Sequence, residues 1–207
     1  YCYYITPPIL STCLSRNVMR KFLYLYAQFE IFAICGVLIG GFWVQFGSSE
    51  YPCPLCIVQR MAMILCALGP ALIVMHGLRS RDIEFATILT GYGMSILGAV
   101  VGLAASSRQV LLHILPGDEG YGSLMMGLHL YTWALIVFLF VLVFSGSRLL
   151  LFHSVTPQPT KNRWTGRAVI WLFGLVITAN IVSVFFEAGL HAFLPDNPTS
   201  YRLIDGP

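Results

Sequence analysis

Five apolar segments dominate this sequence, and each is near or above the roughly 20 residues that an α-helix needs to cross a bilayer. Hydrophobic residues make up 57% of the 207-residue chain and charged residues 10%, whereas soluble domains carry about 25% charged residues. Lipid cannot satisfy exposed backbone groups, so membrane spans of this kind fold as helices. We therefore predict an all-α integral membrane protein with spans at residues 22–46, 57–78, 83–105, 124–152 and 168–190.

The distribution of basic residues predicts the orientation of these spans. If the N-terminus is cytoplasmic, nine of the 12 Lys and Arg residues face the cytoplasm, as the positive-inside rule requires. The nine are Arg16, Arg20, Lys21, Arg79, Arg81, Arg148, Lys161, Arg163 and Arg167. This orientation places Cys53 and Cys56 on the outer, oxidising side, where disulfides persist. The net charge of +3 forms no basic patch with interleaved aromatic residues, which argues against a nucleic-acid partner.

The same pattern divides the chain into four parts. We expect an N-terminal cytoplasmic extension (1–19), a four-span core (20–152), a polar cytoplasmic linker (153–167), and a fifth transmembrane helix with a periplasmic tail (168–207). Met19 has the position of a translation start before a retained signal anchor, so we interpret residues 1–18 as an upstream or wrongly assigned extension. The fourth span is longer than a bilayer requires and is expected to tilt or project into the cytoplasm.

The most informative stretch is residues 51–60, which places a Cys-x-x-Cys pair at the mouth of the second span. Two thiols at the spacing of Cys53 and Cys56 can close a disulfide that exchanges readily. Pro52 and Pro54 favour a helix start, because proline is tolerated in a first turn. A thiolate at a helix N-terminus is stabilised by the unpaired amides and the helix dipole. These residues predict redox chemistry.

Arg60 strengthens this prediction. It follows Cys56 by four residues and Cys53 by seven, so the three side chains share a helix face. An arginine within an apolar span is costly and is a functional candidate by default. Its charge can stabilise a thiolate and the negative charge that develops on a quinone oxygen. Gln59 offers a neutral donor on nearly the same side. The stretch therefore indicates electron transfer between a dithiol and an acceptor dissolved in lipid.

Other interpretations of the cysteine pair remain open. Haem attachment requires histidine directly after the second cysteine, where Ile57 stands. A zinc site needs two further ligands, which His113 and His191 on the same side could supply, although we predict no metal. A purely structural disulfide is a further alternative. A thioredoxin-like fold is excluded because no βαβ pattern flanks the motif.

The outer segment 106–123 contains a second set of candidates. Residues 110–115 are apolar but too short to span, and Pro116 and Gly117 end the run. We predict a short interfacial helix that roofs the outer end of the bundle. Gln109 and His113 on this segment are candidates to contact a quinone headgroup.

Small residues and isolated polar residues within the spans are interpreted structurally. Gly36 and Gly40 in the first span, and Gly98 and Gly102 in the third, form faces that allow helices to approach closely. Glu30 and His129 could serve a proton path or a quinone, but we prefer a packing role for both. Asn180 and Glu187 could bond neighbouring helices. Four cysteines outside the pair are interpreted as small hydrophobic residues: Cys2, Cys13, Cys35 and Cys66.

Residues 51–60 resemble the disulfide bond formation protein B (DsbB) family of membrane enzymes, which oxidise thiols and reduce quinone. The similarity rests on Pro52, Cys53, Leu55 and Cys56 at the entry to the second span, followed by Arg60. Trp43 and Gln45 also resemble that family's end of the first span. The resemblance covers residues 20–152 and implies that Cys53 and Cys56 exchange electrons with a bound ubiquinone or menaquinone, assisted by Arg60.

Two departures from the family pattern affect this interpretation. The family's best-known members carry a second cysteine pair in the outer loop, which relays electrons from a thioredoxin-like oxidase, and segment 106–123 has no cysteine. The chain also adds a fifth span. We predict a quinone-coupled thiol:disulfide oxidoreductase of the bacterial inner membrane that accepts electrons from a periplasmic thioredoxin-like dithiol protein. The alternative is a non-catalytic accessory subunit of a larger membrane complex, with a structural disulfide.

Overall fold

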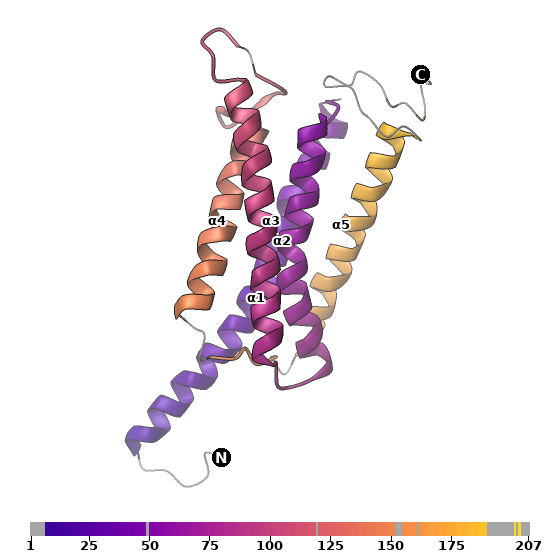
Figure 1. The fold of residues 1–207 in the computed structure, drawn as a ribbon. Helices are drawn as coiled ribbons and strands as arrows, with labels where there is room; N and C mark the ends of the chain where they lie inside the picture. The colour runs from indigo at the N-terminus through magenta and orange to yellow at the C-terminus, as the bar shows by residue number, and fades with distance from the viewer. Residues whose placement is uncertain are drawn as a thin grey trace.

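The computed structural model describes residues 7–48, 50–118, 120–151, 155–160 and 162–189, together with 201 and 203, and it describes side chains from Arg16 onward. Within these residues the chain forms an up-and-down bundle of five helices (Figure 1). Their bounds are α1 Pro7–Gly47, α2 Pro54–Arg79, α3 Phe85–Leu112, α4 Leu130–Leu151 and α5 Trp164–Ala188. All five are long and apolar enough to cross a membrane. The predicted all-α, five-span fold is therefore confirmed.

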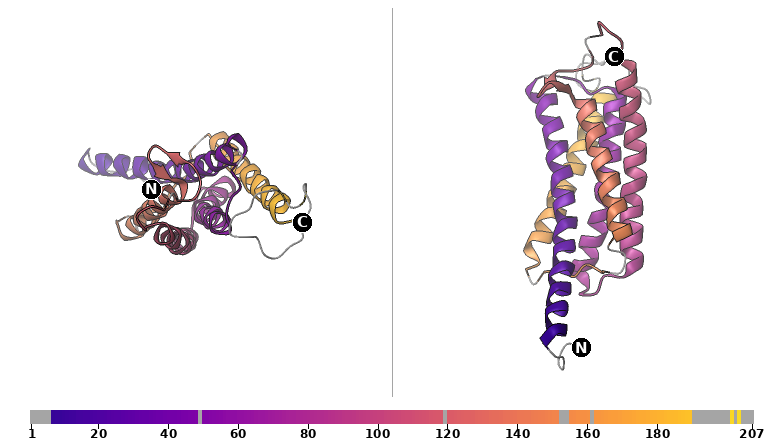
Figure 2. Two further views of the ribbon diagram at one scale, coloured as in Figure 1. Left: turned by 90° about the horizontal axis from the view of Figure 1, so that it is seen from above. Right: turned by 90° about the vertical axis from the view of Figure 1, so that its left-hand side faces the viewer.

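The α1 helix is longer than the span predicted from hydropathy. It begins at Pro7, and its N-terminal part projects beyond the ends of the other four helices (Figure 2). Proline is tolerated in a first helical turn, and neither glycine nor proline interrupts the chain between Pro8 and Gly36. Hydropathy marked only the apolar part of a continuous helix.

The α4 helix is shorter than predicted, because the segment before it forms a hairpin. Strands β1 (Leu124–Met125) and β2 (Leu128–His129) pair antiparallel across Met126 and Gly127, whose φ angles are 54° and 84°. Two consecutive positive φ angles are typical of a tight hairpin turn and are incompatible with a right-handed helix. The predicted start of the fourth span at residue 124 is wrong, and the 22 residues of α4 leave no excess length.

The predicted interfacial helix at residues 110–115 is also wrong. The α3 helix continues without a break to Leu112, and both Ser106 and Gln109 are buried. Because no helix-breaking residue precedes Pro116, hydrogen bonding carries α3 past the apolar segment predicted at 83–105. Residues 106–112 are therefore the last turns of a membrane helix rather than a separate surface element.

The α2 helix lies at the centre of the bundle and contacts each of the other four helices. Viewed from above, α3 and α4 lie to one side of α2 and α5 to the other (Figure 2). Pro70 lies within α2, and its missing N–H leaves the carbonyl of Cys66 without its helical partner. Ser95 Oγ of α3 donates to that oxygen at 2.8 Å. This bond satisfies the exposed carbonyl within the membrane and joins α2 to α3.

Glycines have opposite roles in α1 and α3. A Cβ on Gly98 would lie 2.9 Å from the backbone nitrogen of Cys66, so α2 and α3 can approach closely only because Gly98 has no side chain. The packing role predicted for Gly98 is confirmed. By contrast, no atom lies within 4 Å of a Cβ built on Gly36 or Gly40. The close approach predicted for these two residues is wrong, because they border open space.

Arginines gather at the end of the bundle opposite the start of α2. Arg20 Nε and Arg148 Nη2 donate to the carbonyls of Thr156 and Val155, at 3.0 and 2.7 Å, and thereby hold the linker before α5. Arg163 Nη1 donates at 2.6 Å to the carbonyl of Leu78, near the C-terminus of α2. A cation at that position satisfies a terminal carbonyl and complements the helix dipole.

The contact at Gly98 predicts how single methyl groups change stability. We expect Gly98→Ala to reduce the free energy of unfolding by about 1–3 kcal/mol, because the added Cβ forces α2 and α3 apart. Gly93→Ala on the same helix is the control, since a Cβ there meets no atom within 4 Å. Chemical unfolding of the purified proteins in detergent, followed by circular dichroism, measures both. Equal stability of the two variants would contradict the close approach.

Candidate functional site

The two cysteines of the pair occupy the first turn of α2. Cys53 is the N-cap residue with extended backbone, and Pro54 is the first residue of the helix. The Cys56 N–H donates to Cys53 Sγ at 3.3 Å, and the two sulfurs lie 2.8 Å apart as free thiols. The predicted helix start is confirmed. The capping sulfur of Cys53 thus accepts a hydrogen bond from an amide that the helix leaves unpaired.

Gln109 of α3 joins both sulfurs to a buried amide chain. Its Nε2 lies 3.3 Å from Cys53 Sγ and 3.7 Å from Cys56 Sγ, and its Oε1 accepts from Gln59 Nε2 at 2.9 Å. Gln109 is only 2% exposed. Its predicted place on a surface segment is wrong, because the last turns of α3 pack directly beside the start of α2. The Gln109 amide therefore connects both sulfurs to the Gln59 side chain.

The Arg60 side chain extends from α2 toward α1. Its Nη1 donates to Gln45 Oε1 at 2.7 Å and its Nη2 to the carbonyl of Gly41 at 3.3 Å. The guanidinium also lies over the Phe42 ring, with its carbon 5.2 Å from the ring centroid. Arg60 is thus held in one orientation, and its charge attracts negative charge on Cys56.

A cavity of about 470 Å³ lies beside these groups, between α1 and α4. Cys56, Gln59 and Arg60 form its α2 wall, whereas Cys53 and Gln109 stand behind that wall. Gly36 and Gly40 border it, which explains the open space beside them. The remaining wall is mostly apolar and includes Val37, Tyr51, Tyr121, Tyr131, Trp133, Ala134 and Val137.

A second cavity, of about 290 Å³, continues from the first along the same two helices. The two share the wall residues Ala33, Val37 and Val137. Glu30 and Cys66 border the second cavity and not the first. The two cavities therefore lie next to each other, the first at the cysteine end and the second toward the middle of the bundle.

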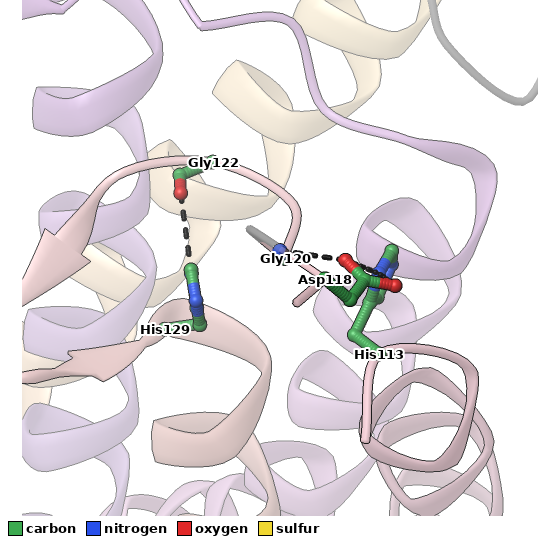
Figure 3. Close-up of polar contacts among 5 residues, drawn as sticks. All are labelled: His113, Asp118, Gly120, Gly122 and His129. Atoms are coloured by element: carbon green, nitrogen blue, oxygen red, sulfur yellow. Dashed lines mark hydrogen bonds and ion pairs between the residues drawn. The ribbon is translucent and has the colours of Figure 1, made fainter. Parts of the chain in front are cut away.

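His113 holds the outer loop rather than lining the cavity. Its Nδ1 lies 3.1 Å from Asp118 Oδ1, and the same oxygen accepts from the Gly120 N–H at 2.8 Å (Figure 3). These hydrogen bonds, first the one from Gly120, hold the pKa of Asp118 below its usual range. The His113 ring also stacks on Tyr131, with centroids 5.8 Å apart. His113, a predicted headgroup contact, therefore does not border the cavity itself and contacts it only through Tyr131.

His129 closes the other side of this loop. Its Nδ1 lies 3.2 Å from the carbonyl of Gly122 (Figure 3). Its ring also stacks on the Tyr131 ring, with centroids 5.1 Å apart. The packing role preferred for His129 agrees with these contacts. Tyr121 in the same loop donates its hydroxyl to the Tyr51 carbonyl at 2.6 Å, and burial raises the pKa of that hydroxyl.

The electrostatics distinguish the two thiols. Cys53 is 5% exposed. Its hydrogen bond to Cys56 and its burial raise the pKa of the Cys53 thiol. Cys53 therefore keeps its proton at neutral pH. The sulfur that loses its proton first is then the one in the cavity wall, Cys56.

Sequence reasoning named Asn180 and Glu187 of α5 but missed Ser183, which connects this helix to the site. Ser183 Oγ accepts from Gln45 Nε2 at 3.0 Å, and the Tyr201 hydroxyl lies 3.1 Å from the same nitrogen. The signal was available in the buried stripe of α5, because Val176, Asn180, Ser183 and Glu187 recur at helical spacing. The fifth helix therefore reaches the residue that holds Arg60.

Two further predictions concern metal binding and the four cysteines outside the pair, and the structure describes only some of these residues. Among the described residues no group of three or more His, Cys, Asp and Glu could hold a metal ion. The candidate zinc ligand His191 lies outside those residues, as do the side chains of Cys2 and Cys13. Cys35 and Cys66 are buried free thiols, in keeping with their predicted packing role.

Comparison with known proteins finds one family model that is similar to part of this chain. Residues 25–123 match the family model described as disulfide bond formation protein DsbB. This part of the chain includes the cysteine pair, Gln59, Arg60, Gln109 and His113. No solved structure matches the chain.

Curated relatives named disulfide bond formation protein B match part of the chain. Disulfide bond formation protein B 1 of Pseudomonas syringae pv. syringae (strain B728a) is 39% identical over 88 residues, which is 42% of this chain and 48% of the relative. The protein of Marinobacter nauticus is 33% identical over 90 residues, 43% and 51% of the two chains. That of Azoarcus sp. (strain BH72) is 30% identical over 106 residues, 51% and 57%. The chain spans about half the length of these relatives, and its similarity to the disulfide bond formation protein DsbB family lies in residues 25–123.

Proposed function

We propose that this protein is a quinone-coupled thiol:disulfide oxidoreductase of the bacterial inner membrane. The observation that carries the proposal is the position of Cys56, whose residue lies in the wall of an apolar cavity beside Arg60 while its sulfur lies 2.8 Å from that of Cys53. Disulfide exchange needs an accessible sulfur with a second sulfur within bonding reach. Electron transfer to a lipid-soluble acceptor needs an apolar site open along the membrane, and one end of α2 provides both.

The residues of the cavity suit a quinone. Ligand sites of this kind commonly measure about 300–1,000 Å³, with mostly apolar walls and a few polar groups that fix orientation. Here the polar groups come from Arg60, Gln59 and Gln45, and the second cavity offers room for an apolar tail between α1 and α4. Bound ubiquinone or menaquinone would supply a two-electron, two-proton acceptor. The role of the protein is to orient that acceptor against Cys56 and to place the positive charge of Arg60 beside it.

The cysteines themselves exchange with a periplasmic thioredoxin-like dithiol protein. A partner thiolate attacks the disulfide form of the pair, which breaks the Sγ–Sγ bond and forms a mixed disulfide. The second partner thiolate resolves this bond, and Cys53 and Cys56 gain two electrons and two protons. Because residues 106–123 contain no cysteine, the partner must engage this pair directly or bring its own shuttle. Reoxidation returns the two electrons and two protons and restores the disulfide.

Orientation in the membrane supports the same proposal. The end of the bundle that carries Arg20, Arg148 and Arg163 lies opposite the cysteine pair, and basic residues are retained on the cytoplasmic side. We therefore propose that the N-terminus is cytoplasmic and that Cys53 and Cys56 face the periplasm. Acidic residues at the cysteine end, Glu50 and Asp118, agree with this orientation.

Replacement of the cysteine pair tests the proposal directly. We expect Cys53→Ser and Cys56→Ser each to abolish quinone reduction by a reduced dithiol protein, because neither variant can form the disulfide. Cys35→Ala is the matched control, since this buried thiol borders neither cavity. Turnover is followed by quinone absorbance in detergent or proteoliposomes. Unchanged turnover in the serine variants would reject the enzyme and favour the accessory subunit.

Filling the cavity tests where the acceptor binds. We expect Gly40→Leu to raise the KM for quinone about tenfold or more, because its side chain would occupy space that is open beside Gly40. Gly174→Leu on α5 is the control, since it also meets no atom within 4 Å and borders neither cavity. Steady-state kinetics with varied quinone separate KM from kcat. An equal effect of the two substitutions would place the acceptor elsewhere.

The unequal thiols predict an order of alkylation. The pKa of Cys53 is raised, so this thiol stays protonated through neutral pH and deprotonates only in more alkaline solution. We expect iodoacetamide at neutral pH to modify Cys56 of the reduced protein at least about tenfold faster than Cys53, because the thiolate is the nucleophile. Peptide mass mapping after short exposures measures both rates. Preferential modification of Cys53 would reverse the assignment of roles.

A further inference from the structure

Gln45, close to the C-terminus of α1, has every hydrogen-bonding position of its side-chain amide occupied. A glutamine amide offers two N–H donors and a carbonyl oxygen with two lone pairs. Its Nε2 donates to Ser183 Oγ at 3.0 Å and to the Tyr201 hydroxyl at 3.1 Å. Its Oε1 accepts from Arg60 Nη1 at 2.7 Å and from Ser183 Oγ at 3.4 Å. We call these four residues the Gln45 junction, and Gln45 at its centre is 3% exposed.

The contacts of the Gln45 junction determine which way the amide faces. Arg60 can only donate, so the Gln45 oxygen faces it and the nitrogen faces away. The nitrogen then needs acceptors, and the hydroxyls of Ser183 and Tyr201 provide them. A reversed amide would place its N–H groups against Arg60 Nη1 and leave buried donors unsatisfied, which is costly. The two hydroxyls therefore hold the amide in the orientation that binds Arg60.

The Arg60 guanidinium is held against α1 and borders the first cavity. Besides Gln45, the Gly41 carbonyl accepts from Nη2 at 3.3 Å, and a Cβ built on Gly41 would lie 3.6 Å from that nitrogen. The Phe42 ring lies 5.2 Å from the guanidinium carbon, measured to the ring centroid. The hydrogen bonds to Gln45 and Gly41 engage two of the five N–H donors of an arginine. Arg60 is thus fixed in place by one set of donors and has others to offer an oxygen in the cavity.

The fifth helix acts on this arrangement from outside the cavity. It packs against α1 and α2, and no described residue of α5 borders the first cavity, which lies between α1 and α4. Ser183 is 6% exposed and lies on the buried stripe of α5. The Tyr201 ring lies against the Tyr51 ring, with centroids 5.0 Å apart. Ser183 therefore reaches the cavity through Gln45, and through Gln45 it reaches Arg60.

We propose that Ser183 and Tyr201 are positioning residues of the quinone site, which orient Arg60 through the Gln45 amide and thereby raise the affinity for a quinone carbonyl. This inference rests on the proposed function, and it gives the fifth helix a part in that function. A long side chain that must be ordered when a ligand binds loses affinity, and ordering it beforehand restores that affinity. The Gln45 junction orders Arg60 before the ligand arrives.

Quinone binding to the oxidised full-length protein in detergent tests this inference without turnover. The probe is ubiquinone with one isoprene unit, and its binding is followed by quenching of tryptophan fluorescence, since Trp133 borders the cavity. We expect Ser183→Ala to raise the Kd about three- to tenfold, the range that corresponds to one hydrogen bond. Thr178→Ala is the control, because this exposed hydroxyl donates to the Gly174 carbonyl of its own helix. Its Kd should stay within about twofold of the unmodified protein.

A double substitution separates positioning from packing. If Ser183 acts through Gln45, then Ser183→Ala in a Gln45→Ala background should change the Kd by less than about twofold. A hydroxyl that only packed α5 against the bundle would weaken binding by the same factor in both backgrounds. Equal factors would therefore overturn the inference, and so would an unchanged Kd in Ser183→Ala alone.

Tyr201→Phe covers the case in which the Gln45 variant does not fold. It keeps the ring against Tyr51 and removes the second acceptor of Gln45 Nε2, so the Kd should rise about as much as in Ser183→Ala. In steady-state kinetics the same loss should raise the KM for quinone, with kcat within about twofold. A change confined to kcat would contradict the inference. Shifted Kd values in a protein that reduces no quinone would instead reject the proposed function and leave the role of the Gln45 junction standing.

Discussion

A single buried guanidinium organises the functional end of this bundle. Arg60 lies two turns inside α2, where a cation needs partners that do not come from water. The Gln45 amide, the Gly41 carbonyl and the Phe42 ring, all from α1, provide them. The same demand explains why Gln45 is also held by Ser183 of α5. Three helices thus converge on one charge, and the thiol pair and the cavity lie beside it.

The sequence predicted the parts of this arrangement that depend on local chemistry. Apolar length identified five spans, and Pro54 after Cys53 identified the start of α2, because helix ends have specific backbone requirements. Helical spacing also predicted that Arg60 shares a face with the cysteines; Cys56 and Arg60 border the same cavity, whereas Cys53 does not. Hydropathy could not locate the end of α3, since Ser106 and Gln109 look like loop residues until the neighbouring α2 buries them. Hydropathy also missed the hairpin turn at Met126 and Gly127, because this turn lies within an apolar run.

The contributions that sequence reasoning missed all depend on contacts between distant segments. Gln109 reaches the sulfurs across 53 and 56 positions in the chain, and no local pattern reveals such a contact. Gly36 and Gly40 have the spacing of a close-packing face, yet whether a partner helix fills that face is a property of the whole bundle. The family match ends at residue 123, so it includes neither α4, which forms one wall of the cavity, nor α5.

The continuity of the two cavities has a consequence for traffic through the membrane. Since Ala33, Val37 and Val137 border both, a long flexible molecule bound in one cavity could extend into the other. Exchange of the proposed quinone acceptor would then depend on two-dimensional diffusion within the lipid. The composition and fluidity of the surrounding membrane would then affect the rate of acceptor exchange as directly as any residue at the thiol pair.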